Sequence, residues 1–223
     1  MNKFNFKTID NFEKHIELSI PNFRTLDNIF FAISKEFAQP ESGIIDLGCS
    51  TGRFLSKFSD ANDISLYGID TVKFKDQRTN NFIFEELDIE EGLDKHMDDN
   101  ISVIVCMFML QFLGQKKRER VLKKLKHYVT NKGTTLLISE KVFLTDSRLQ
   151  TLIHRLHIQE KRKGFTDTEI LDKDDQLAVS MFCKNERELS SELNHIGVST
   201  KVWQSYNFMG FCIKNRSKND AYI

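Results

Sequence analysis

The stretch IIDLGCSTGRFL, residues 44–55, decides the fold of this chain. An apolar run contains Asp46, a cluster of small residues with Gly48, Ser50 and Gly52 follows, and apolar residues then return. This order predicts a strand that turns tightly into a helix, as the first strand of a doubly wound sheet does. An acid at a strand end, followed by small residues, also predicts a ligand site at that turn.

The turn does not fit a phosphate cradle. Counted from Gly48, a dinucleotide fingerprint needs glycine at its third and sixth positions, where this chain has Ser50 and Arg53. A Walker-type loop needs a Gly-Lys-Ser/Thr sequence, which does not follow. S-adenosylmethionine (SAM) carries no phosphate, and it suits this turn better. Its ammonium could face Asp46, while the amides of Gly48 to Ser50 could meet its carboxylate.

Short apolar runs alternate with helical stretches after Pro40. The runs are GIIDLG (43–48), ISLYGID (64–70), FIFEELD (82–88), ISVIVCMFM (101–109) and TTLLISE (134–140). They lack a polar residue at every second position, as expected for parallel strands covered on both faces. TKVWQSYNFMGFCIK at 200–214 predicts two further strands around a turn near Asn207. The expected fold class is α/β, a doubly wound sheet that is mostly parallel with a C-terminal antiparallel hairpin.

Three segments stand apart from this alternation within an expected single domain over 1–216. Residues 1–40 predict an N-terminal helical cap, because apolar residues between Pro21 and Pro40 recur at helical spacing. Residues 142–187 predict an inserted lid or dimer segment. Its first helix is expected to turn four apolar residues inward, namely Leu149, Leu152, Ile153 and Leu156. Residues 217–223 are expected to form a tail.

The composition excludes several classes of protein. Lysine plus arginine and aspartate plus glutamate both number 32, so the formal net charge is +0, which argues against stable nucleic-acid binding. The longest apolar run, 101–113, is too short to span a bilayer, and the first residues lack a signal-peptide core. The cysteines form no CxxC pair, and the pair His154 and His157 lacks further ligands, so no metal is expected. We expect a cytoplasmic protein without a membrane anchor.

Acids at two further strand ends fit the adenosyl part of such a ligand. Asp70 ends the run 64–70, where a carboxylate can accept both ribose hydroxyls. Asp88 ends the third run and could accept the adenine amine, with Ile89 against the ring. Met107 would flank the methionine portion. Taken singly, Asp46 or Asp70 is better explained as a helix cap, but the set of the turn, Asp70 and Asp88 in register favours SAM binding.

Several short motifs resemble one branch of the class I SAM-dependent methyltransferases, which have a Rossmann-like doubly wound sheet. DLGCS (46–50), LQFL (110–113), SEK (139–141), TEI (168–170) and NF (207–208) are similar to those of carboxy-S-adenosylmethionine synthase. The resemblance implies formation of carboxy-SAM from SAM and prephenate, for modification of the wobble uridine of transfer RNA. It also implies a homodimer in which the insertion reaches the partner's site. The cofactor contacts that it implies are Phe23, Gly48, Cys49, Ser50, Asp70, Thr71, Asp88, Ile89 and Met107.

Three positions depart from the family pattern. Phe23 stands where the family carries tyrosine, and Met107 where it carries asparagine. The family's arginine that pairs with the added carboxylate falls on Asp174, with Lys173 beside it. A carboxylate repels another carboxylate, and lysine is a poorer clamp than the bidentate arginine.

Three functional hypotheses therefore stay open. The first is a SAM-dependent methyltransferase with an unknown acceptor and a small-molecule substrate. The second is carboxy-SAM synthesis, and the third is a non-catalytic SAM-binding dimer. Catalytic residues cannot be assigned without the acceptor. Glu140 and Lys141, at the end of the fifth run, are candidates for contact with it, and a salt-bridged strand end is an equal alternative.

Overall fold

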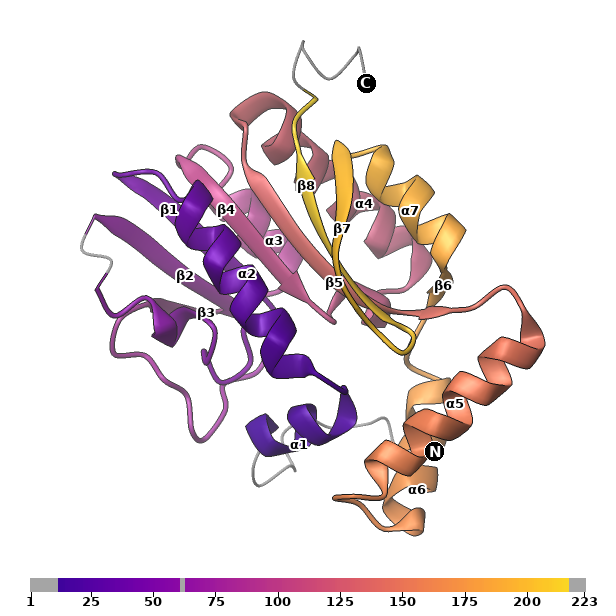
Figure 1. The fold of residues 1–223 in the computed structure, drawn as a ribbon. Coiled ribbons are helices and arrows are strands. Elements are labelled where there is room, and N and C mark those ends of the chain that lie inside the picture. The colour runs from indigo at the N-terminus through magenta and orange to yellow at the C-terminus, as the bar shows by residue number, and fades with distance from the viewer. Residues whose placement is uncertain (1–11, 61–62, 217–223) are drawn as a thin grey trace.

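The structure is a computed structural model, and it describes residues 12–60 and 63–216. A single sheet forms its centre, with strand order β3-β2-β1-β4-β5-β8-β7, and β6 pairs with β5 outside this path (Figure 1). Strands β3, β2, β1, β4 and β5 are parallel, whereas β8 runs antiparallel to both β5 and β7. The fold class predicted from the sequence is therefore confirmed.

The strands follow the apolar runs of the sequence closely. Their bounds are β1 Ser42–Leu47, β2 Ile64–Asp70, β3 Ile83–Glu86, β4 Ile101–Met107, β5 Thr135–Phe143, β6 Lys184–Asn185, β7 Val198–Ser205 and β8 Phe208–Lys214. All residues of β1 are buried, and so are the first six of β4. Burial on both faces explains why these runs lack alternating polar residues.

The helices lie on both faces of the sheet and beyond one edge. Their bounds are α1 Phe12–Ser19, α2 Phe23–Phe37, α3 Ile89–Lys95, α4 Gln115–His127, α5 Ser147–Lys161, α6 Asp167–Ala178 and α7 Glu186–Asn194. Three single-turn 3-10 or π segments, η2 Leu55–Lys57, η3 Leu110–Phe112 and η4 Tyr128–Lys132, complete the order. Helices α3, α4 and α7 share one apolar core with the sheet, and α2 shares the other (Figure 1).

Helix α2 shows how the sequence sets this arrangement. Leu26 and Phe30, one turn apart, are fully buried against the sheet. A Cβ on Gly210 of β8 would lie 2.7 Å from the Leu26 side chain, so glycine there lets the helix approach the strand. Because both residues carry large side chains, their burial contributes roughly 1.5–3 kcal/mol each.

The helix expected directly after the first turn is absent, and this prediction was wrong. Residues 51–54 form turns, and only the 3-10 segment η2 follows. Ser50 and Gly52 both have positive φ, 52° and 77°, a conformation that ends any regular helix. A Cβ on Gly52 would also lie 2.2 Å from the ring of Phe82. The chain therefore folds around that ring in place of a longer helix.

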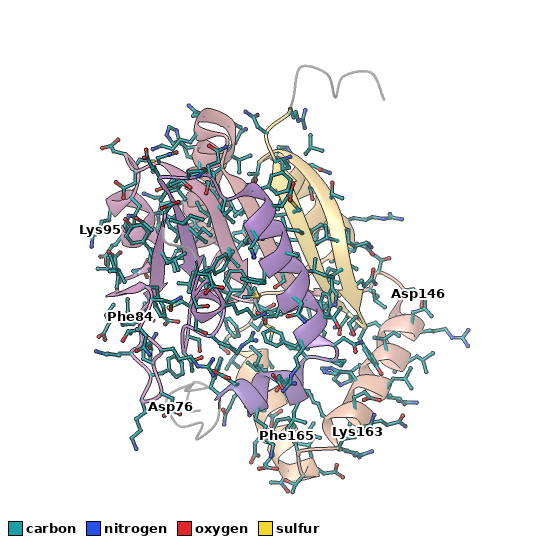
Figure 2. All side chains as sticks on the ribbon, turned by 60° about the vertical axis from the view of Figure 1, so that its left-hand side comes forward. Asp76, Phe84, Lys95, Asp146, Lys163 and Phe165 are labelled. Carbon is teal, nitrogen blue, oxygen red and sulfur yellow. The ribbon has the colours of Figure 1, made fainter. Side chains whose placement is uncertain are left out.

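The orientation expected for α5 was also wrong. Leu149, Leu152 and Leu156 are exposed, with relative accessibilities of 52%, 52% and 38%, whereas His157 and Lys161 are buried. The side chains of His157 and Lys161 face the body of the protein, where they border a cavity. Figure 2 labels Asp146 at one end of this helix and Lys163 at the other. Side chains on the outer face of the helix extend away from the sheet. The expected tail, 217–223, lies outside the described residues, as do residues 1–11 of the expected cap.

Candidate functional site

A cavity of about 410 Å³ lies at the carboxyl ends of the parallel strands. Helix α1, helix α2, the first turn and the two helices of the insertion all contribute to its walls. This is the edge at which open α/β sheets bind ligands. The structure brings all the cofactor-binding residues expected from the sequence to this one cavity, namely Phe23, Asp46, Gly48, Cys49, Ser50, Asp70, Thr71, Asp88, Ile89 and Met107.

Asp46 is the most unusual group in the cavity wall. It is 2% exposed, and among the described residues none donates a hydrogen bond to its carboxylate. Burial, together with the negative charge of nearby Asp70, raises the pKa of Asp46 to about 8. A buried carboxyl group without donors is costly unless a cation or donor reaches it. The end of β1 therefore offers a place for a positively charged ligand group.

The backbone of the first turn is already engaged, contrary to the expectation from the sequence. The amides of Gly48 and Cys49 donate to the carbonyl of Ile69, at 2.7 and 3.1 Å. The amide of Ser50 donates to Asp70 Oδ2 at 2.9 Å. These bonds tie β1 to β2, so the three amides do not point at a ligand carboxylate. The hydroxyl of Ser50, which is buried without a partner, is the donor that the turn leaves for a ligand.

Asp70 is held in place by the backbone around it. Its Oδ2 accepts from Ser50 and its Oδ1 accepts from the amide of Val72 at 3.1 Å. Burial raises the pKa of Asp70, and the backbone hydrogen bonds from Ser50 and Val72 act against that rise. Each carboxylate oxygen has a second lone pair, so two ligand hydroxyls can still be bound.

Asp88 serves both as a helix cap and as a wall of the cavity. Its Oδ1 accepts from the amide of Glu90 at 2.9 Å, which caps α3, and its Oδ2 pairs with Lys117. Burial opposes ionisation of Asp88, but the hydrogen bonds from Lys117 and Glu90 and the charges of Lys117 and Arg120 together outweigh it, so the pKa is lowered. The sequence pointed to Asp88 and missed Lys117, which lines the same cavity from α4.

Arg53 stabilises the wall between the first turn and α2. Its guanidinium forms two hydrogen bonds with Asp27, of 2.7 and 2.9 Å, and lies 4.7 Å from the ring centre of Phe23. Bidentate pairing and a cation–π contact fix the position of this arginine. Phe23, expected from the sequence, is thereby held against the cavity.

The opposite end of the cavity is basic. Lys141 of β5, Lys161 of α5 and Lys173 of α6 all line it. Burial, together with the positive charge of nearby Lys161, lowers the pKa of Lys173 to about 7. Burial also lowers the pKa of Lys141. Asp174 pairs with Lys161 at 3.0 Å, so the acid at the family's arginine position neutralises one of these three cations.

Helix α1 closes the cavity on the side away from the sheet. At its first turn, Glu13 accepts from Arg78 at 2.8 Å and from the hydroxyl of Thr51 at 3.3 Å. At its last residue, Ser19 accepts from Lys173 through its hydroxyl, and its carbonyl lies 2.8 Å from His157 Nε2. The helix is therefore fastened to the acidic end and to the basic end alike.

His157 is not half of a metal pair. Its ring packs against Phe208, with centroids 5.2 Å apart, and burial lowers its pKa to about 4. The neutral ring then donates from Nε2 to Ser19, which fixes the tautomer. Among the described residues, no group of three or more His, Cys, Asp and Glu side chains gathers as metal ligands. That the protein needs no metal stays a prediction.

Glu140 does not contact the cavity, and its expected role toward the acceptor was wrong. It is fully buried and accepts from Arg118 Nη1 at 2.8 Å. Arg118 is itself buried and also pairs with Glu192. The salt-bridged alternative holds for Glu140, whereas its neighbour Lys141 lines the cavity. Strand alternation explains the difference, because successive side chains point to opposite faces.

The comparisons with known proteins agree with this fold. A family model described as a methyltransferase domain matches residues 44–133. The carboxy-S-adenosyl-L-methionine synthase of Alteromonas mediterranea is 29% identical over 218 residues, covering 92% of this chain and 89% of the relative. That of Colwellia psychrerythraea is 28% identical over 217 residues, with coverages of 92% and 88%.

One solved structure extends the comparison to the fold. The N-methyltransferase NodS from Bradyrhizobium japonicum, solved in complex with S-adenosyl-L-homocysteine (SAH), aligns with a TM-score of 0.56 at 14% identity. The alignment covers 93% of this chain and 94% of NodS. No helix in the described parts of the chain is long and apolar enough to cross a membrane. This chain therefore has the class I methyltransferase fold, matches a methyltransferase-domain model over residues 44–133 and resembles carboxy-S-adenosyl-L-methionine synthases over most of its length.

Proposed function

We propose that the cavity binds SAM and that the protein is a SAM-dependent transferase acting on a small molecule. The observation that carries this proposal is the buried carboxyl group of Asp46, which no described residue supplies with a donor. The ammonium of SAM would satisfy it, and its sulfonium adds positive charge beside Asp70. The bound cofactor would supply an activated carbon for transfer. The solved neighbour NodS holds SAH, which is SAM without its transferable methyl group, and this supports the same ligand.

The residues divide the proposed cofactor among them. Asp46 and the hydroxyl of Ser50 would hold the amino-acid end, and Asp70 with Thr71 the ribose. Asp88 would accept from the adenine amine, and Ile89 would pack on the ring. Gly48 and Cys49 would shape the turn beneath the ligand, whereas Phe23 and Met107 would flank the methionine chain. All of these residues line one cavity.

Isothermal titration of SAH into the purified protein tests this proposal. We expect saturable binding in the wild type and its loss in Asp46→Asn, which keeps the shape and removes the charge. Gln39→Ala is the matched control, because Gln39 lies before β1 and does not line the cavity. Wild-type protein that binds neither SAH nor SAM would rule out the whole proposal. Wild-type protein that binds SAM but transfers no group would rule out only the proposed transferase activity. The latter result would favour the non-catalytic dimer.

The basic end of the cavity favours carboxy-SAM synthesis as the second candidate. Lys141, Lys161 and Lys173 line this end of the cavity, and Asp174 pairs with Lys161. An acidic co-substrate such as prephenate would be attracted there, and the added carboxylate would meet lysine where the family uses arginine. The names of the curated relatives support this candidate. Lysine is the weaker clamp, so the methyltransferase with an unknown acceptor stays the main proposal.

Mass spectrometry separates the two candidates. Wild-type protein incubated with SAM and prephenate would yield a SAM derivative heavier by one carboxyl group if it is a carboxy-SAM synthase. Unchanged SAM in that reaction, together with SAH formation when a methyl acceptor is present, supports the main proposal. The variant Lys173→Met is the control, since it should lower the yield of the carboxylated product without weakening SAH binding.

We further propose a homodimer formed through the insertion, residues 142–187. The exposed residues Leu149, Leu152 and Leu156 form an apolar stripe on α5, which a second copy would cover. A cytoplasmic location, where SAM is available, and no stable nucleic-acid binding complete the proposal. Light scattering after size exclusion tests the dimer: Leu152→Glu should yield monomers, and the equally exposed Arg155→Glu should not. A monomeric wild type would exclude it.

A further inference from the structure

Gln111 is a buried polar side chain in the cavity wall that the proposed cofactor does not use. It lies in η3, between β4 and α4, and is 5% exposed. Its backbone carbonyl accepts from the amide of Phe182 at 2.6 Å, which ties the end of the insertion to η3. Buried polar groups need hydrogen-bond partners, so the side-chain amide of Gln111 needs one for each of its ends.

The orientation of this amide is fixed by the backbone of β5. The amide of Lys141 donates to Gln111 Oε1 at 2.8 Å. A backbone N–H can only donate, so the atom that faces it must be the oxygen and the other end must be the NH₂ group. Among the described residues, none accepts a hydrogen bond from Gln111 Nε2. The donor is therefore left for whatever enters the cavity.

The residue whose backbone holds Gln111 carries a second donor. Lys141 lines the cavity, and in the described parts of the chain no side chain accepts a hydrogen bond from its ammonium group. Besides burial, the groups that shift the pKa of Lys141 are Cys183, Lys161 and Asp174. Of these, Asp174 is already paired with Lys161. Gln111 and Lys141 thus present donors and no acceptor toward the cavity. These two donors can both bind an oxygen atom with lone pairs, whereas a protonated amine offers them no acceptor.

We propose that Gln111 binds the second substrate by donating its side-chain N–H to an oxygen of that molecule, together with the ammonium of Lys141. The substrate class is then a carboxylate or another oxygen-acceptor compound, and not an amine. The inference rests on the proposed function, because it takes the acidic end of the cavity to hold the cofactor. Gln111 lies two residues from Met109, which contacts Gly48 at that end, so a group bound there adjoins the cofactor.

Two variants separate binding from structural support. Gln111→Glu keeps an oxygen for the amide of Lys141 but replaces the donor with an acceptor. Gln111→Met has a similar length and removes both hydrogen bonds without adding charge. Benzoate and benzylamine are matched probes, since they share a ring and differ in offering an oxygen acceptor or a donor. Both are titrated by NMR into protein saturated with SAH, and SAH affinity is measured separately.

We expect the wild type to bind benzoate with a Kd on the order of millimolar, and to bind benzylamine more weakly. Both variants should bind benzoate about 10-fold less tightly, the effect of losing one hydrogen bond to a charged group. SAH affinity should not change, and Gln111→Glu should keep the wild-type melting temperature. A merely structural Gln111 would leave benzoate binding intact in Gln111→Glu and lower stability in Gln111→Met.

Three results would overturn the inference. The first is a wild type that prefers benzylamine or binds neither probe. The second is a loss of benzoate binding in Gln111→Glu alone, which charge repulsion would explain. The third is unchanged benzoate binding in both variants. A wild type that fails to bind SAH contradicts the proposed function instead. In that case the benzoate titration of the cofactor-free protein still tests the donor role of Gln111.

Discussion

The two ends of the cavity differ in charge and in origin. The acidic end consists of Asp46, Asp70 and Asp88, each at or just past the carboxyl end of a parallel strand. The basic end is built by Lys141 at the end of β5 and by the insertion, which contributes Lys161 and Lys173. The sheet thus supplies one charge and the helices added to it supply most of the other. A cationic cofactor and an anionic co-substrate can therefore share one cavity without competing for it.

The largest expected effect is on the acidic end alone. Asp46→Asn should weaken SAH binding on the order of 100-fold, because it removes one partner of a buried charged contact. The same variant should leave benzoate binding at the basic end within about twofold, since distant independent sites act additively. Calorimetry of both ligands measures the two effects. Equal losses at both ends would show that the division between them is wrong.

The reciprocal change should act on the basic end. Lys173→Met should weaken benzoate binding about 10-fold, because it removes a buried cation from the wall. Asp174→Asn should strengthen it, since Lys161 loses its carboxylate partner and its charge becomes available to the ligand. SAH affinity serves as the control in both variants. The comparison fails if the two substitutions shift benzoate affinity in the same direction.

The pH dependence of SAH binding should follow Asp46. Its pKa in the folded, ligand-free protein is raised to about 8, so the carboxyl group is protonated at pH 6 and must lose its proton to hold an ammonium. SAH affinity should rise with pH up to about 8, approaching 10-fold per pH unit. For the same reason, the free energy of unfolding of the ligand-free protein should decrease between pH 4 and 8. Asp46→Asn should lack both slopes, and a wild type with flat profiles would contradict this assignment.

The smallest expected effect on either ligand comes from Glu140, which lies next to Lys141 but outside the cavity. Glu140→Gln should lower the free energy of unfolding by about 1–3 kcal/mol, since Arg118 keeps only Glu192 as a charged partner. Affinities for SAH and benzoate should both stay within about twofold of wild type. Chemical denaturation and the same titrations measure this. A large loss of benzoate binding would place Glu140 in the site after all.

The acidic end could be predicted from the sequence because strand ends in a doubly wound sheet converge at a known edge. A run of apolar residues that ends in Asp46 or Asp70 therefore specifies both the element and the position of its acid. Of the basic end, only Lys141 could be predicted in this way, from its place at the end of the fifth run. Lys161 and Lys173 occur in polar helices among many other lysines, and no spacing marks them as buried.

The errors have the same cause. Helical periodicity assigns an apolar stripe to α5, but it does not say whether the stripe faces the body of the protein or a partner. Leu149 and Leu152 were expected inside for this reason, while His157 and Lys161 occupy that side. Arg118 lies among basic neighbours in the sequence, and no local pattern marks it as buried. Its burial depends on Glu140 and Glu192, which are distant in sequence.

Helix α1 carries a kinetic consequence of this layout. Glu13 anchors it beside the first turn and Ser19 anchors it beside Lys173 and His157, so one short segment covers both compartments. Displacement of α1 would break contacts on both sides at once. Ligand exchange at the two ends would therefore be coupled through this one helix.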